Sequence, residues 1–81
     1  MNISIEPIKD AGQKFSKKGD ELKVLIFQTR NFMDQYFLGG RQQEWKDIQP
    51  DLDQSLISIQ KASDFLNTLY NDLCEVDSKL N

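Results

Sequence analysis

The sequence predicts an all-α fold, an antiparallel hairpin of two long helices that pairs into a four-helix bundle. Three observations predict this fold. Apolar residues recur every three or four positions in both halves of the chain, a double glycine separates the two patterns, and no useful length of sequence alternates as a β-strand does. Because the chain has only 81 residues, we expect the hairpin to fill it as a single domain.

The first helix is predicted from about residue 7 to residue 36. Pro7 suits the first helical turn, and Ser4 or Glu6 is a candidate to cap that end. Gly12 and Gly19 lie at the edge of the apolar stripe, where they either admit a close partner helix or are merely tolerated. The stripe consists of Ile8, Ala11, Phe15, Leu22, Leu25, Thr29, Phe32 and Tyr36, widened by Ile26 and Met33.

The second helix is predicted from about residue 41 to residue 80. Its apolar seam repeats in steps of three and four for five heptads, as in a coiled coil, and only Ser55 in it is polar. Pro50 lies inside this run and is expected to kink the helix or to mark a restart. The seam consists of Trp45, Ile48, Leu52, Ser55, Ile59, Ala62, Leu66, Leu69, Leu73, Val76 and Leu80.

Gly39 and Gly40 form the predicted turn, over about residues 37–40. Both apolar patterns stop there, and glycine takes the left-handed conformation that ends a helix without steric cost. So short a connection makes the two helices antiparallel. A second apolar set, Phe27, Ile57 and Phe65, falls outside the stripes and predicts a surface for a partner, unless these long side chains only wrap the hairpin edge.

The composition argues against catalysis and against several kinds of binding site. There is no histidine, so no Ser–His or Cys–His pair can form, and the single Cys74 is neither half of a disulfide within the chain nor a zinc site. We therefore predict no enzyme activity, no metal and no cofactor. The net charge of −3 disfavours nucleic acid, and no stretch approaches the length of a membrane span. The first ten residues do not resemble a general secretory signal peptide.

The predicted turn reads Phe37-Leu38-Gly39, between two amphipathic helices, with Trp45 six positions beyond the glycine and Pro50 early in the second helix. This arrangement resembles the WXG family of small proteins exported by type VII (Esx) secretion systems. Members of that family are helical hairpins of about this length with a Trp-x-Gly turn. The resemblance covers nearly the whole chain, and here phenylalanine replaces the tryptophan.

The resemblance also implies an export signal and partners. One form of the family's C-terminal signal is matched by Leu73, Asp77 and Leu80, whereas the Tyr-x-x-x-Asp/Glu form is not, because Cys74 follows Tyr70 at that spacing. Family members pair with themselves, with a homologous hairpin, or with the N-terminal helices of a larger secreted toxin, and are recognised by the secretion ATPase. The implied location is the bacterial cytoplasm before export, then the medium or the cell surface.

Two other functions fit a short helical hairpin. One is a structural subunit of a needle or filament, although the Gly39-Gly40 turn suits such subunits poorly. The other is an intracellular adaptor or antitoxin-like protein that is acidic and helical. Filament formation at high concentration would favour the first, and failure to reach the medium in any strain would favour the second.

Overall fold

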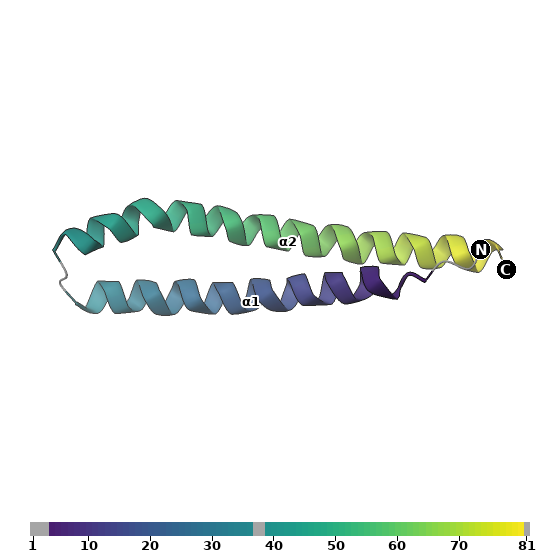
Figure 1. The fold of residues 1–81 in the computed structure, drawn as a ribbon, viewed down its shortest axis with the longest axis horizontal. Coiled ribbons are helices and arrows are strands. Elements are labelled where there is room, and N and C mark those ends of the chain that lie inside the picture. The colour runs from purple at the N-terminus through teal and green to yellow at the C-terminus, as the bar shows by residue number, and fades with distance from the viewer. Residues whose placement is uncertain (1–3, 37–38, 81) are drawn as a thin grey trace.

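The computed structural model describes residues 4–36 and 39–80, with side chains described as far as residue 76. Two helices make up this part of the chain, α1 (Glu6–Gln35) and α2 (Gly40–Leu80). They run antiparallel and lie side by side (Figure 1). The predicted all-α helical hairpin is confirmed.

The N-terminus of α1 is capped by backbone hydrogen bonds alone. Ile5 occupies the cap position, and its carbonyl oxygen accepts hydrogen bonds from the N–H groups of Ile8 and Lys9 at 3.1 and 3.4 Å. Pro7 lies in the first turn, where a missing N–H leaves no helical bond unmade. No side chain caps this end, so the expected cap by Ser4 or Glu6 is wrong.

The C-terminus of α1 is held by a side chain from α2. Tyr36 turns to an extended conformation (φ −120°, ψ 134°), which ends the helix. The Gln42 side-chain amide then donates to the carbonyl oxygens of Met33 and Tyr36 at 3.2 and 3.1 Å. These carbonyls belong to the last turn, which has no further helical donors. Gln42 therefore ties the end of α1 to the beginning of α2.

α2 continues through Pro50 without interruption. The restart considered from the sequence does not occur, although the first turns of α2 are inclined to the rest of the helix (Figure 1). We attribute the inclination to Pro50, because an internal proline removes one helical hydrogen bond and clashes with the carbonyl four residues earlier.

The hairpin is a single layer of helices. It measures 64 × 16 × 13 Å, and one helix with its side chains is about 10–12 Å thick. Each helix therefore has one neighbour, and most of its circumference faces solvent. Among the described side chains, Ile26 at 5% exposure is the buried apolar one, and Ser63 at 6% is the buried polar one.

Four rows of residues face the interior, each with members seven positions apart. In α1, Gly12, Gly19 and Ile26 are buried and Met33 is half-buried. The second row of α1 is half-buried at Ile8 and Leu22 and exposed at Phe15 and Thr29. In α2, every residue of the two interior rows is half-buried or buried. They are Trp45, Leu52, Ile59, Leu66 and Leu73, and Gln42, Gln49, Leu56, Ser63 and Tyr70.

The apolar stripes predicted from the sequence are only partly interior. The seam row from Trp45 to Leu73 faces α1, and Ile8 and Leu22 of the first stripe face α2, whereas several other members point outward. Leu25, Phe32 and Tyr36 of the first stripe are exposed, and so are Ile48 and Val76 of the second. Gly12 and Gly19, expected at the edge of the stripe, are instead buried and face α2. A Cβ atom on Gly19 would lie 3.4 Å from Ile59 Cγ2, so the small residues let the two helices approach closely.

Candidate helix-docking face

The two long sides of the hairpin differ in chemistry, and the antiparallel arrangement explains why. When two helices run in opposite directions, the row preceding Gly12 and Ile26 by one residue lies on the same side as the row preceding Leu56 and Ser63. We call this side the apolar flank. Its rows are Ala11, Lys18, Leu25 and Phe32 of α1, and Ile48, Ser55, Ala62, Leu69 and Val76 of α2.

The other side, the polar flank, carries the direct contacts between charged side chains of α1 and α2. Its rows are Lys9, Ser16, Lys23 and Arg30 of α1, and Lys46, Asp53, Gln60, Asn67 and Cys74 of α2. Arg30 Nη2 lies 3.9 Å from Asp53 Oδ1. With its amide oxygen turned toward Arg30, Gln49 accepts hydrogen bonds from Nε and Nη2 at 2.9 and 2.6 Å. One guanidinium thus bridges both helices on this flank.

Further polar contacts join the N-terminal part of α1 to α2. Ser63 Oγ donates to the Gly12 carbonyl oxygen at 3.1 Å, and Asn67 Nδ2 donates to Ser63 Oγ at 3.4 Å. Lys9 Nζ lies 5.8 Å from the centre of the Tyr70 ring, within cation–π range. These contacts join α1 to α2, so the polar side chains that make them already have partners within the hairpin.

Tyr70 and Cys74 form a pair one helical turn apart in α2. A side-chain hydrogen bond with Cys74 and the negative charge of its thiolate raise the pKa of Tyr70 above 10.0, and burial and the Glu6 carboxylate add to the effect. Both side chains are half-buried. The pair lies where Lys9 reaches across from α1, and it contains no histidine or second thiol with which to build a nucleophile.

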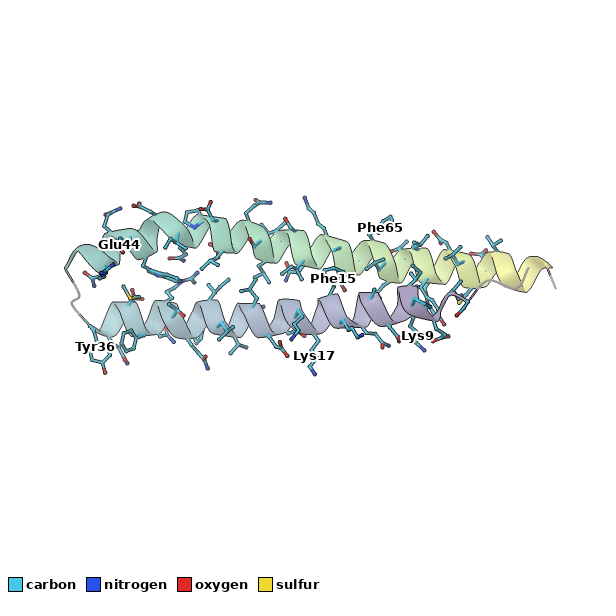
Figure 2. The ribbon with its side chains drawn as sticks, viewed as in Figure 1. Lys9, Phe15, Lys17, Tyr36, Glu44 and Phe65 are labelled. Carbon is cyan, nitrogen blue, oxygen red and sulfur yellow. The ribbon has the colours of Figure 1, made fainter. Side chains whose placement is uncertain are left out.

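The apolar flank, in contrast, carries large side chains that the hairpin leaves uncovered. Leu25 is 58% exposed, and Phe32, Ile48 and Val76 are each about half exposed. A groove of about 290 Å³ lies along it, lined by Ala11, Lys14, Phe15, Lys18 and Ile59. Phe15 lies in the space between the two helices (Figure 2). An apolar strip along both helices is the usual form of a site for further helices.

The three residues predicted for a partner surface are all exposed, but they are not gathered in one place. Phe27 and Ile57 each follow an interior residue, which puts them next to the polar flank. Phe65 precedes the interior residue Leu66, so it adjoins the apolar flank, and it projects from the edge of α2 that faces away from α1 (Figure 2). Much of the uncovered apolar surface is made instead by other members of the predicted stripes, such as Leu25, Phe32 and Ile48.

The turn and export motifs are only partly described. Gly39 has a φ of +61°, the left-handed conformation that glycine favours, and its carbonyl oxygen accepts from the Gln42 N–H at 3.2 Å. Gly40 is the first residue of α2. Phe37 lies outside the described residues. Leu73 is half-buried against α1, and the side chains of Asp77 and Leu80 lie beyond those described.

Several residues that shape the hairpin do not stand out in an apolar pattern. The interior row of α2 contains Gln42, Gln49 and Ser63, and that of α1 contains Gly12 and Gly19. The signal that identifies them is a spacing of seven between small or amide side chains, one position away from the apolar stripe. Small residues allow close approach, and amide and hydroxyl groups hydrogen-bond across it.

Among residues 4–36 and 39–76, no three His, Cys, Asp or Glu side chains lie close enough to hold a metal ion. Within the described residues, neither helix contains a stretch both long and apolar enough to cross a membrane. Comparisons of the chain with protein-family models, curated proteins and solved structures find no match.

Proposed function

We propose that this chain is a small helix-binding protein associated with type VII secretion, which uses its apolar flank to pack against the helices of a partner. The partner is a second copy, a homologous hairpin, or the N-terminal helices of a larger secreted effector. The chain is either exported as a dimer or directs the effector to the secretion ATPase. It has no catalytic role in this function.

The single observation that supports the proposal is the difference between the two flanks. The hairpin uses glycine, serine and amide side chains for much of its own interior, and it leaves leucine, isoleucine and aromatic side chains along one uncovered side. Burying apolar surface contributes about 25 cal/mol per Å², and a standard interface buries about 800 Å² on each partner. Covering the apolar flank therefore supplies the stability that the single-layer hairpin lacks.

The association with type VII secretion comes from the resemblance described above, with its helix–turn–helix organisation and its Phe37-Leu38-Gly39 turn. In this chain phenylalanine replaces the tryptophan of the turn. Only one form of the C-terminal signal is matched, by Leu73, Asp77 and Leu80. Both departures favour a protein that acts together with a partner. In such a complex the partner supplies part of the signal for export.

The first test is the solution mass of the purified protein by light scattering over a concentration series, with helix content followed by circular dichroism. We expect either a stable dimer of the 9.4-kDa chain, or a poorly helical chain that gains helix and mass when a helical neighbour is co-expressed. A fully folded monomer that binds no helical protein at any concentration would remove the proposal.

The secretion part of the proposal is tested in a strain with a type VII system. Asp77→Ala is expected to leave the mass and helix content unchanged and to block the appearance of the chain, or of its partner, in the medium. Asp72→Ala is the matched control, because it removes a carboxylate of the same helix outside the motif. Normal export of the Asp77 variant would separate the binding function from this signal.

A further inference from the structure

A second apolar site lies on the opposite side of the hairpin from the apolar flank. It is a groove of about 530 Å³ between the middle of α1 and α2, whose lining includes Lys23, Val24, Phe27, Arg30, Asp53 and Leu56. We call it the Phe27 groove. A bundle partner seated on the apolar flank would leave this groove open, because the two sites face different sides of the hairpin.

The groove has an apolar floor and an exposed aromatic wall. Leu56 is half-buried and the neighbouring Ile26 is buried, so the floor belongs to the hairpin interior. Phe27 is 59% exposed and Val24 is about half exposed, although the rest of this side is mostly charged or amide side chains. An exposed aromatic residue beside an apolar depression is a favourable anchor for an inserted side chain.

The charged residues at the rim of the groove indicate which charge a partner should carry. Arg30 and Asp53 largely offset each other, since their charged atoms lie 3.9 Å apart. Lys23 makes no ion pair or hydrogen bond with the residues described and is exposed, so its ammonium group gives the rim a net positive charge. Because the whole chain carries a net charge of −3, this is a local basic site on an acidic protein.

We propose that the Phe27 groove binds one amphipathic, acidic helix of another protein. That helix would insert an aromatic or branched side chain against Phe27 and Leu56, and would place a carboxylate about one turn away, beside Lys23. That carboxylate would give Lys23 an ion-pair partner, which the hairpin itself does not supply. The site would let one hairpin hold a bundle partner and a further protein at the same time.

The test uses 4-phenylbutyrate as a probe that carries a ring and a carboxylate, with 4-phenylbutyramide as its uncharged match. Binding is followed by NMR on the isotope-labelled full chain, in whatever oligomeric state it adopts. We expect millimolar binding of the acid, with shifts centred on Val24, Phe27 and Leu56, and weaker binding of the amide. Lys23→Gln is expected to weaken binding of the acid by about two- to fivefold and to leave that of the amide unchanged.

Phe27→Ala is expected to weaken binding of both probes by about tenfold or more, whereas Phe65→Ala, which removes an exposed aromatic ring elsewhere on the hairpin, is expected to have no effect. Helix content and mass of each variant show that the fold is kept. The proposal is overturned if neither probe shifts the groove residues, if the shifts centre on the other groove, lined by Ala11, Phe15 and Ile59, or if acid and amide bind equally well. A monomeric chain that still binds at Phe27 would count against the proposed bundle partner and not against this site.

Discussion

Ser63 Oγ donates a hydrogen bond to the carbonyl oxygen of Gly12, and this bond joins α2 to the backbone of α1 in the interior of the hairpin. The carbonyl already belongs to a helix, so it uses its second lone pair for Ser63. A Cβ atom at position 12 would clash with the Asn67 side chain, so glycine there leaves room for the Ser63–Gly12 contact.

Gly12→Ala and Gly19→Ala are expected to differ in their effect on stability. A Cβ atom on Gly19 meets Ile59 Cγ2 at 3.4 Å, an ordinary contact, so the variant should gain about 0.5–1 kcal/mol from the reduced freedom of the unfolded chain. A Cβ atom on Gly12 would clash with Asn67 Oδ1, and Asn67 would have to give up its bond to Ser63. Gly12→Ala should therefore gain nothing or lose stability in urea unfolding. A larger gain for Gly12→Ala than for Gly19→Ala would contradict the helix approach described here.

Gly39→Ala should destabilise the hairpin, and Gly40→Ala should not. Gly39 has a φ of +61°, which costs about 1–2 kcal/mol for a residue with a Cβ atom. A Cβ atom on Gly40, which begins α2, meets nothing within 4 Å, so alanine there favours the helix. Thermal unfolding of the two variants under identical conditions measures the difference. Equal melting temperatures would mean that the chain does not turn through a left-handed residue 39.

Leu25 and Ile26 are neighbours in the sequence with opposite roles. Ile26 is buried between the helices, so Ile26→Ala should cost about 2–5 kcal/mol of folding free energy. Leu25 lies on the apolar flank at 58% exposure, so Leu25→Gln should change the stability of an isolated hairpin by about 0.5 kcal/mol or less. It should instead weaken association, seen as a shift of the mass–concentration curve in light scattering. An unchanged curve would show that the flank is not an interface.

The pKa of Tyr70 should fall toward its ordinary value when Cys74 is replaced by alanine, because the side-chain hydrogen bond and the thiolate charge that raise it are both removed. Cys74→Ser keeps a hydroxyl and loses only the charge, so it should give an intermediate value. Phenolate absorbance during an alkaline titration, in a Tyr36→Phe background, measures the change.

The raised pKa of Tyr70 also determines how the stability of the hairpin changes with pH. A raised pKa means that the folded chain holds the phenol proton more tightly than the unfolded chain does. The stabilisation is therefore fully present below pH 10, the ordinary pKa of tyrosine, and it is lost as the pH rises through the raised value. Greater stability of the hairpin at more alkaline pH would contradict the Tyr70–Cys74 contact.

The sequence predicted the two helices, their antiparallel arrangement and the turn at Gly39, because apolar periodicity and a glycine break are local signals. It predicted only in part which side of each helix faces the other, because Leu66 and the other members of its row are interior whereas Leu25 is exposed. Leu25 and Ile26 both fit an apolar stripe, but in the structure Ile26 shares the buried row of Gly12 and Gly19, whereas Leu25 is exposed. A stripe that serves a partner as well as the hairpin is wider than the hairpin interior, so its centre does not mark that interior.

The polar residues of the interior were missed for a related reason. Gln42 and Ser63 are ordinary surface residues by type, and their roles depend on carbonyl oxygens of α1 that are distant in the sequence. Arg30 is likewise unremarkable until Gln49 and Asp53 are placed beside it by the fold.

The slender outline of the molecule has a consequence for how it moves through confined spaces. A compact chain of 81 residues would have a radius of gyration of about 12 Å, whereas this one has 18.7 Å because its mass is spread along one axis. Seen end-on, the hairpin is 16 Å by 13 Å. An opening wide enough for two helices side by side would admit the hairpin lengthwise with its hydrogen bonds intact. A bound partner would widen the cross-section, so the complex would need a larger opening.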